Sequence, residues 1–251
     1  FDEKRYFAEG VKACVVDVAG IKVGITICED IWHKEPADAA AKLGAEFLIN
    51  LNASPFHRGK HKERWQVLAQ RATEQNIPMV YVNQVGGQDE LVFDGGSFAV
   101  NANGELAMVA PDFEEGTYEL SVSRTVRGVE IDQGIAASAL SDTAAVWQAL
   151  VLGVRDYVEK NGFPGVVLGL SGGIDSAVTL AVAVDALGAD RVQAVMMPFK
   201  YTADMSVEDA GEQAATMGVE YDVISIERIY EMFMSGLLEQ FEGTKADTTE
   251  E

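Results

Sequence analysis

The sequence contains only two cysteines, Cys14 and Cys28, among its 251 residues. Two cysteines provide no disulfide framework, so we expect a reducing compartment and a cytoplasmic protein. Long apolar runs are also absent, since no stretch approaches the roughly 18 uninterrupted apolar residues of a membrane-spanning helix. The chain opens with Phe-Asp-Glu-Lys-Arg, which is neither an initiating Met nor a signal peptide. We therefore expect part of a longer protein that has no membrane partner.

Positive charge is scarce as well. Lys and Arg number 19 against 40 Asp and Glu, which gives a net charge of −21. A surface this acidic repels phosphate backbones, so nucleic-acid binding is not expected. A local phosphate site is still compatible with this charge, because backbone N–H groups and a bound metal can supply positive potential. With 48% apolar and 24% charged residues, the composition is that of a globular protein.

The first 110 residues alternate short β-rich runs with helical segments. Two runs flank Ala19-Gly20, a dipeptide typical of a hairpin turn. In the second helical segment Trp65, Leu68 and Ala72 recur at helical spacing. The expected strands are 11–18, 22–28, 45–51, 79–85, 97–100 and 105–109, and the expected helices are 36–43 and 60–76.

From about residue 125 the periodicity fades, and we expect a linker over 126–143 between one domain at 1–125 and another at 144–251. Helices at 144–159, 175–187 and 207–217 then alternate with strands at 165–170, 192–197 and 221–226. Such alternation with short loops predicts a doubly wound parallel sheet.

A glycine-rich turn, Gly169-Leu170-Ser171-Gly172-Gly173-Ile174-Asp175-Ser176, lies between an expected strand and an expected helix. Glycines allow a phosphate to approach the backbone, and the start of a helix adds positive potential. Asp175 would repel a bare phosphate, so it suggests a Mg²⁺ ion between carboxylate and phosphate. The alternative is a plain strand-to-helix turn with a serine cap; the flanking strand and helix favour phosphate binding.

The turn is neither a Walker A loop nor a dinucleotide fingerprint, because it lacks the Lys-Ser/Thr pair and the G-x-G-x-x-G spacing. It does fit G-x-S-x-G, which would make Ser171 the nucleophile of an α/β-hydrolase. That fold needs a histidine after the serine. All three histidines, His33, His57 and His61, precede the serine, so the hydrolase interpretation fails within this sequence.

Residues Ser171–Ser176 resemble the pyrophosphate loop of ATP pyrophosphatases, which cleave ATP between the α and β phosphates and adenylate a substrate. The segments Leu152–Tyr157, Met196-Met197-Pro198 with Tyr201-Thr202, and Asp247–Glu251 resemble NAD synthetases. The resemblance implies that ATP is held by Gly169, Leu170, Ser171, Gly172, Gly173, Ile174, Asp175 and Ser176. It also implies Mg²⁺ near Asp175, Met197 near the adenine, and nicotinate adenine dinucleotide as the second substrate.

Cys28 ends an expected strand and is followed directly by Glu29 and Asp30. Two neighbouring carboxylates disfavour the thiolate, so a catalytic cysteine here needs a nearby cation or base. The local sequence fits a nucleophile and a buried small hydrophobe equally well. Cys14 lies inside an apolar run and is expected to be structural.

Residues Ile27–Trp32 resemble the nucleophile segment of the nitrilase superfamily. The segments Phe1–Phe7, Asn52–Phe56 and Asn83–Gly87 resemble the version fused to NAD synthetase. Such domains hydrolyse glutamine through a Glu–Lys–Cys triad and a thioester. The resemblance implies that Cys28 is the nucleophile, that the triad Glu and Lys precede Phe1, and that Glu29, Ser54 and Lys60 hold the α-amino and α-carboxylate groups of glutamine.

We thus expect an α/β fold, in which the C-terminal half of a nitrilase-like α/β/β/α sandwich precedes the first part of a doubly wound ATP pyrophosphatase domain. The implied reaction is ATP-dependent amidation of nicotinate adenine dinucleotide to NAD with ammonia from glutamine, and we expect a homo-oligomer. Two alternatives are another pyrophosphate-loop amidating enzyme with a different adenylated substrate, and an ATP-binding module without turnover.

Overall fold

The computed structural model describes residues 5–8, 10, 12–237 and 239. The expected strand start at Val11, part of the motif Phe1–Phe7 and the whole motif Asp247–Glu251 lie outside these residues. The chain divides into two compact units, Phe1–Gly153 and Val154–Glu251. No helix in the described part is long and apolar enough to span a bilayer.

The first unit is built on a six-stranded sheet with the order β1-β2-β3-β4-β7-β8. Strands β2, β3 and β4 run parallel, whereas β1, β7 and β8 join antiparallel. Parallel neighbours require crossover segments, and helices supply them here. The strands are β1 (Cys14–Val18), β2 (Ile21–Ile27), β3 (Phe47–Asn52), β4 (Met79–Asn83), β7 (Phe98–Val100) and β8 (Leu106–Val109).

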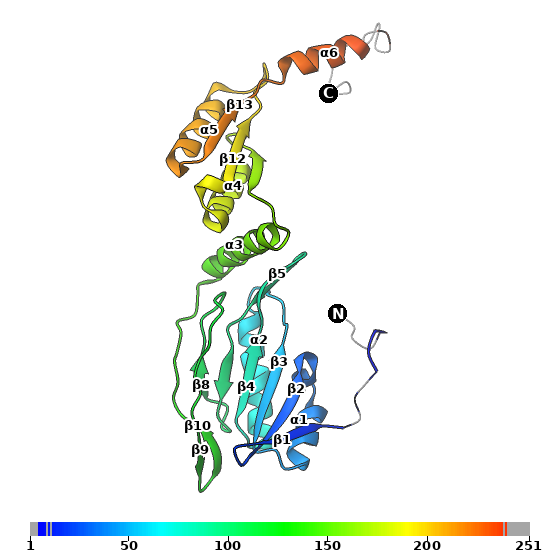
Figure 1. Ribbon diagram of the computed structural model, residues 1–251, viewed down its shortest axis with the longest axis vertical. Helices are drawn as coiled ribbons and strands as arrows, with labels where there is room; N and C mark the ends of the chain where they lie inside the picture. The colour runs from blue at the N-terminus through cyan, green and yellow to red at the C-terminus, as the bar shows by residue number, and fades with distance from the viewer. Residues whose placement is uncertain (1–4, 9, 11, 238, 240–251) are drawn as a thin grey trace. The chain divides into compact units, whose positions relative to one another are not determined.

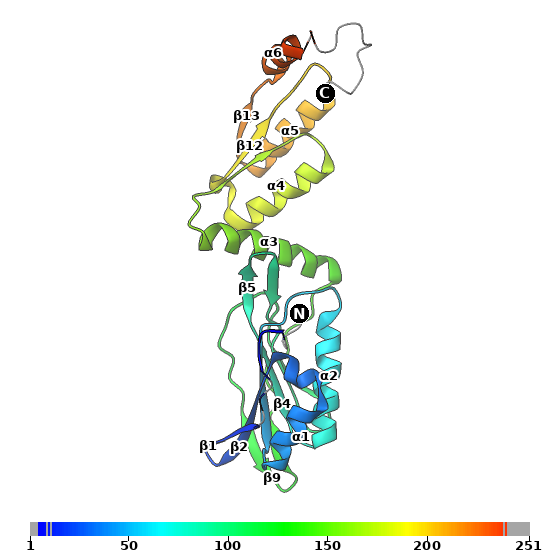
Figure 2. The ribbon, with the colours of Figure 1, turned by 90° about the vertical axis from the view of Figure 1, so that its right-hand side faces the viewer.

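One face of this sheet is covered by α1 (Lys34–Lys42) and α2 (Lys60–Gln75), as Figures 1 and 2 show. Leu68 and Ala72 of α2 are fully buried in the core between helices and sheet, as their spacing predicted. Trp65 does not follow that prediction, because its side chain is 39% exposed. The preceding residue, Arg64, is buried instead.

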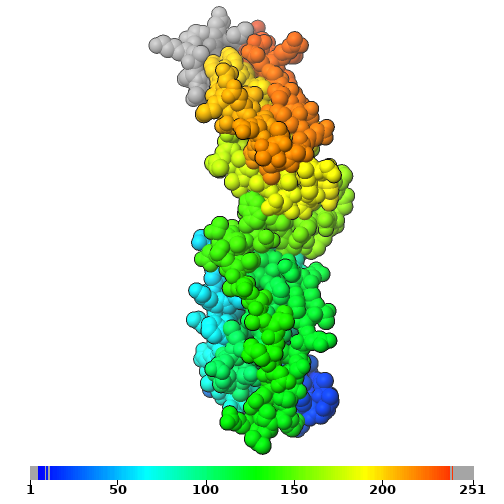
Figure 3. Space-filling model, turned by 90° about the vertical axis from the view of Figure 1, so that its left-hand side faces the viewer, coloured from blue at the N-terminus to red at the C-terminus, as the bar shows by residue number. Residues whose placement is uncertain are grey.

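The opposite face of the sheet is covered by the chain that follows β8. A hairpin of β9 (Val122–Thr125) and β10 (Gly128–Ile131) buries Val129 and Ile131 against the sheet. Figure 3 shows this stretch as a band along one face of the unit. The sequence analysis expected only a linker after residue 125. Strands of four residues show too little alternation to be recognised, and this hairpin is stabilised by packing.

A second short hairpin, β5 (Val85–Gln88) with β6 (Leu91–Asp94), was also not predicted. The expected strand over 79–85 ends at Asn83, and the chain then enters a new sheet. Two glycines in β5, Gly86 and Gly87, weaken its strand signal. This hairpin returns the chain at Asp94 to a position beside Asn83.

Helix α3 (Asp142–Lys160) begins in the first unit and continues past its last residue, Gly153. Its residues Ala149 and Leu152 pack with Phe113 in a small buried cluster, against which Phe56 and Val92 also pack. The rings of Phe56 and Phe113 meet edge to face, with centroids 5.7 Å apart.

The second unit is a parallel βαβαβ arrangement with the strand order β11-β12-β13. Leu180 and Ala183 of α4 and Ala210 and Ala214 of α5 pack on the sheet. The predicted parallel sheet is confirmed; a helix after it, α6 (Glu227–Leu237), was not predicted. The other elements are β11 (Val166–Gly169), α4 (Ile174–Leu187), η3 (Ala189–Arg191), β12 (Val192–Met196), α5 (Asp204–Met217) and β13 (Glu220–Val223).

Candidate active site

Cys28 occupies a sharp turn at the carboxyl end of β2. It begins the short 3-10 helix η2 (Cys28–Trp32), and its φ of 47° lies in the left-handed region that side chains with a Cβ rarely adopt. Strained residues at strand-to-helix turns are typical of nucleophiles, because the turn presents the side chain. The Asp30 carboxylate accepts a hydrogen bond from the Ile27 N–H at 2.9 Å and so stabilises the turn.

The neighbouring strand β3 supports this turn through a buried amide. Asn50 donates to the Thr26 hydroxyl at 3.0 Å and makes a longer contact, 3.5 Å, with the Cys28 carbonyl. The sequence analysis did not identify Asn50, because a polar residue in a predicted strand carries no signal of its own. Cys14, which is expected to be structural, lies exposed on the edge strand β1.

Lys60 brings a positive charge to the end of η2. Its ammonium lies 4.1 Å from the centroid of the Trp32 ring and 3.0 Å from a Glu63 carboxylate oxygen. The structure therefore places Lys60 beside the segment that begins at Cys28, as a cation–π contact. Glu29, within that segment, is exposed.

Ser54 lies in the loop after β3 and is buried. Its N–H donates to the Asn83 Oδ1 at 2.9 Å, and its hydroxyl oxygen accepts from the Arg64 Nε at 3.1 Å. Burial raises the pKa of the nearby Tyr81 phenol, the Ser54 hydroxyl opposes this shift, and Cys28 adds to it.

Arg64 and Asp94 form a buried ion pair behind Ser54 that the sequence analysis missed. Their side chains are 1% and 6% exposed, and Arg64 Nη1 approaches Asp94 Oδ2 at 2.8 Å. A charged residue in a helical pattern normally indicates a solvated face. No local signal pointed to a partner on the unpredicted hairpin β5–β6.

A second ionisable group borders this ion pair. Burial raises the pKa of Asp112, Asp94 adds to the shift, and the charges of His61 and Arg64 oppose it. Asp112 and His61 approach each other at Gly96, where a Cβ would lie 2.3 Å from Asp112 Oδ1 and 3.5 Å from His61 Nε2. Within the described residues, no group of three His, Cys, Asp or Glu side chains could hold a metal ion.

The glycine-rich turn of the second unit follows β11 and starts α4. Its two hydroxyls, on Ser171 and Ser176, lie 3.0 Å apart, and the Ser176 hydroxyl donates to the Gly173 carbonyl at 2.9 Å. Leu170 is buried, and its N–H donates to the Val195 carbonyl at 2.9 Å. The turn is therefore fixed to the sheet by Leu170, while both serine residues remain at least partly accessible.

Gly172 is required by close packing within the same unit. Its φ is +78°, and a Cβ there would lie 2.1 Å from the Ser206 carbonyl oxygen in α5. At the start of α4, Ile174 and Asp175 are exposed. Gly169 at the end of β11 faces Met197, because a Cβ on Gly169 would lie 3.4 Å from its methyl carbon. These contacts bring the loop and Met197 together at the carboxyl ends of two parallel strands.

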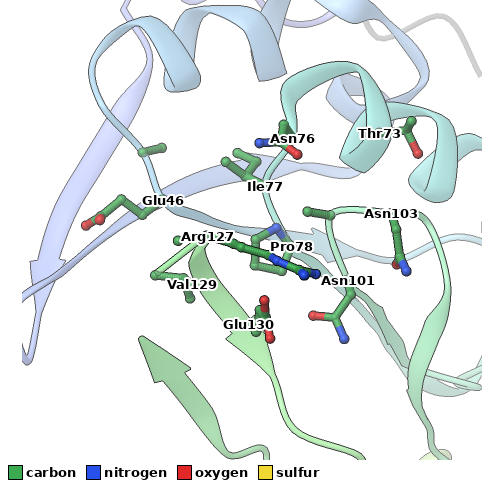
Figure 4. A pocket seen from close by; sticks show the side chains of 13 residues that line it. Glu46, Thr73, Asn76, Ile77, Pro78, Asn101, Asn103, Arg127, Val129 and Glu130 are labelled. Atoms are coloured by element: carbon green, nitrogen blue, oxygen red, sulfur yellow. The ribbon is translucent and has the colours of Figure 1, made fainter. Parts of the chain in front are cut away.

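A cavity of about 580 Å³ lies at another part of the first unit, and it contains no site residue expected from the sequence. In Figure 4 the Arg127 side chain reaches across Pro78 toward Asn101. Glu46 also lines this cavity, and its pKa is lowered from 4.5 to about 2, mainly by a hydrogen bond from Arg124.

Comparison with known families assigns the two units. Residues 1–131, more than half of the chain, match the family model for carbon-nitrogen hydrolase. The chain belongs to the carbon-nitrogen hydrolase family. Behind this carbon-nitrogen hydrolase part, residues 146–251 match the model for NAD synthase. The expected order of a nitrilase-type part and an NAD synthetase part is therefore confirmed.

Relatives of this carbon-nitrogen hydrolase family member match it across both units. A glutamine-dependent NAD(+) synthetase of Acinetobacter baylyi is 49% identical over 253 residues, which are 100% of this chain and 46% of the relative. Another from Thermotoga maritima is 38% identical and also covers 100% of this chain, with 49% of its own length matched. The chain thus spans about half the length of these relatives.

Comparison with solved structures also finds glutamine-dependent NAD synthetases. The glutamine-dependent NAD+ synthetase of Acinetobacter baumannii, in complex with adenosine diphosphate, matches with a TM-score of 0.93 and 49% identity, covering 100% of this chain and 47% of that one. The enzyme of the same description from Cytophaga hutchinsonii has a TM-score of 0.74 at 19% identity over 95% of this chain and 44% of that one, which shows the shared fold.

Proposed function

We propose that this chain is part of a glutamine-dependent NAD synthetase and contributes residues to both of its sites. The observation that carries the proposal is the similarity, over the full chain, to enzymes that bear this description. A strained cysteine turn in one unit and a phosphate-type loop in the other fit the two halves of that reaction.

At the first site, Cys28 attacks the side-chain amide carbon of glutamine. The C–N bond breaks, ammonia leaves with the proton of the thiol, and water then cleaves the thioester to release glutamate. The triad Glu and Lys that would activate the thiol precede Phe1 in the family pattern, so the full-length protein supplies them. Glu29, Ser54 and Lys60 hold the α-amino and α-carboxylate groups of the substrate.

At the second site, the turn Gly169–Ser176 binds the ATP phosphates, and Met197 lies near the adenine. ATP adenylates the carboxylate of nicotinate adenine dinucleotide, pyrophosphate leaves, and ammonia displaces AMP. Asp175 fits as a single carboxylate ligand for Mg²⁺, because this ion takes its other ligands from phosphates and water. When bound, Mg²⁺ would neutralise charge on the phosphates.

The same proposal includes the organisation of the protein. The sequence divides the chain into a glutaminase part at 1–125, a linker at 126–143 and a synthetase part at 144–251; we move the first boundary to Ile131, because β10 packs on the first sheet and the carbon-nitrogen hydrolase match extends to that residue. Cytoplasmic location is supported by the low cysteine content, since two cysteines provide no disulfide framework. Self-association into a homo-oligomer belongs to the proposal as well.

The test measures NAD formation by the full-length protein that carries this chain. The protein receives ATP, Mg²⁺ and nicotinate adenine dinucleotide, with either glutamine or ammonium as the nitrogen source. Cys28→Ala is expected to abolish the glutamine reaction and to preserve the ammonium reaction. Cys14→Ala, the same change at an exposed position, is the matched control and is expected to preserve both.

Two outcomes would contradict the proposal. If the wild-type protein forms no NAD from either nitrogen source, the synthetase assignment is wrong, and another adenylated substrate or a module without turnover must be considered. If Cys28→Ala keeps the glutamine reaction, Cys28 is not the nucleophile.

A further inference from the structure

A row of three polar side chains crosses the sheet just before the strands end at the Cys28 turn. Thr26, Asn50 and Tyr81 are paired in register on β2, β3 and β4, so their side chains share one face of the sheet, and all three are buried. The neighbouring row on the same face contributes Leu48 and Met79 to the apolar core under the helices. A polar row at this depth is therefore an exception within the core, because burial of a polar group is costly.

The amide of Asn50 has one orientation that satisfies its neighbours. Its Nδ2 donates to Thr26 Oγ1 at 3.0 Å and to the Cys28 carbonyl oxygen at 3.5 Å. A carbonyl only accepts, so exchanging the nitrogen and oxygen of the amide would place two acceptors opposite each other. Asn50 therefore contacts the backbone of the nucleophile turn as a donor.

Stability alone does not account for this amide. Asn50 is 0% exposed, and its Oδ1 is a buried acceptor without a hydrogen-bond partner in the part of the chain that the structure describes. An unpaired buried acceptor destabilises the folded state, and an apolar side chain of similar size would avoid that cost. The presence of the amide points to a need for its donor, and the backbone group that receives this donor belongs to Cys28.

The contact also determines how the turn presents its other groups. The carbonyl and the N–H of one trans peptide point in opposite directions, so a Cys28 carbonyl held by Asn50 turns the Glu29 N–H away from the core. Cys28 begins η2, and the first N–H groups of a helix have no partner within it. The φ of 47° at Cys28 is strained and persists only where surrounding contacts enforce it. Asn50 supplies such a contact from the neighbouring strand.

We propose that Asn50 is a positioning residue for Cys28, and that its hydrogen bond to the Cys28 carbonyl holds the strained turn in the geometry needed for attack on the glutamine amide. The thiol and the N–H that follows it then face the same substrate carbonyl. Fixed groups of this kind lower the barrier of the reaction and leave substrate binding nearly unchanged. This inference rests on the proposed glutaminase function.

The test uses the full-length protein that carries this chain and measures ammonia release from glutamine. The main variant combines Thr26→Val with Asn50→Leu, because removal of both partners leaves neither the hydroxyl nor the amide unpaired. We expect kcat to fall about 10- to 100-fold and KM to change by no more than about threefold, as for an interaction that acts in the transition state. The unfolding temperature should equal or exceed that of the wild type.

Three controls separate positioning from stability. Thr26→Val alone keeps the contact between Asn50 and Cys28, so its kcat should remain within about threefold of the wild type. Asn101→Leu is the same substitution at an amide that bonds the N–H and carbonyl of Ile131 at the opposite end of the sheet, and it should lower the unfolding temperature with no change in kcat. Alkylation of Cys28 by iodoacetamide, followed by mass spectrometry, should keep its rate within about twofold in the double variant, because this reaction places no charge on a carbonyl oxygen.

A second variant serves if the double variant does not fold. Asn50→Asp has nearly the same size as the wild-type residue. A protonated aspartic acid can donate to the Cys28 carbonyl, whereas an ionised one cannot. The kcat of Asn50→Asp relative to that of the wild type should therefore rise as the pH falls.

Several results would overturn the inference. These are a wild-type kcat in the double variant, an equal fall in kcat and in the alkylation rate, and a relative kcat of Asn50→Asp that is independent of pH. A fall in the unfolding temperature of the double variant as large as that of Asn101→Leu would give Asn50 a purely structural role and would overturn it as well. If the wild-type protein releases no ammonia through Cys28, the proposed function itself fails, which is a separate result.

Discussion

Replacing Gly172 with alanine tests whether the glycine-rich turn depends on contact with α5. The residue has a φ of +78°, and an added Cβ would lie 2.1 Å from the carbonyl oxygen of Ser206 and 2.7 Å from its carbonyl carbon. These are backbone atoms in the first turn of a helix, so they cannot rotate away as the end of a side chain would. Either the turn or the start of α5 has to move.

The expected cost has two parts. A side chain in the left-handed region costs about 1–2 kcal/mol per residue, and overpacking against a fixed neighbour costs roughly 1–3 kcal/mol more. Gly172→Ala should therefore reduce local stability by about 2–5 kcal/mol. Gly162→Ala is the matched control, because Gly162 has a φ of +70° but nothing within 4 Å of its Cβ position. Gly162→Ala should therefore lose only the stability that a side chain in the left-handed region costs, about 1–2 kcal/mol.

Hydrogen exchange at the α4 amides of the full-length protein measures this difference, and the KM for ATP in the ammonium-dependent reaction measures its effect on the loop. We expect faster exchange and a higher KM for Gly172→Ala, and near-normal values for Gly162→Ala. If both variants lose the same stability, the contact between the turn and Ser206 is not tight and the argument is refuted.

Two further predictions concern the first unit. The φ of Cys28 is 47°, a value that glycine adopts more readily than alanine. The Cys28→Gly variant should therefore be more stable than Cys28→Ala by about 1 kcal/mol, as measured by thermal unfolding. Equal stability of the two variants would show that the turn is not strained. Asp112 has a pKa raised above its usual 3.8 by burial, which means that its charged form is disfavoured in the folded protein. Asp112→Asn should therefore increase the free energy of unfolding at neutral pH. This gain should disappear as the pH falls below 3.8, because Asp112 is then protonated in both the folded and the unfolded protein. Urea unfolding across a pH series measures the difference. A less stable Asp112→Asn at neutral pH would show that the charge makes a favourable contact instead.

The parts of the fold that the sequence predicts are those with long periodic patterns. The parallel strands β2, β3 and β4 are apolar runs, and α4 and α5 bury small residues at helical spacing. The hairpins β5–β6 and β9–β10 escaped prediction because each strand has four residues and because their stability comes from distant packing partners.

For the candidate site, the position of Cys28 at the end of a strand and the strand-to-helix position of the turn Gly169–Ser176 were predictable from local sequence. The roles of Ser54 and Lys60 came only from a family resemblance, since a lone serine and a charged helix start have no chemical signature. The pair of Arg64 and Asp94 was missed for a physical reason. Its members are 30 residues apart, and burial of a charge cannot be predicted until its partner is known.

The packing of α3 on the first unit determines where the chain can be shortened. Leu152 of α3 is 4% exposed and covers Phe113, whose ring contacts Phe56 two residues after Ser54. A truncation at Ile131, where the carbon-nitrogen hydrolase match stops, would leave these aromatic rings open to solvent and favour aggregation. A truncation after Lys160 would retain the whole helix. The smallest stable piece of the first unit therefore includes a helix that lies mostly within the NAD synthase match.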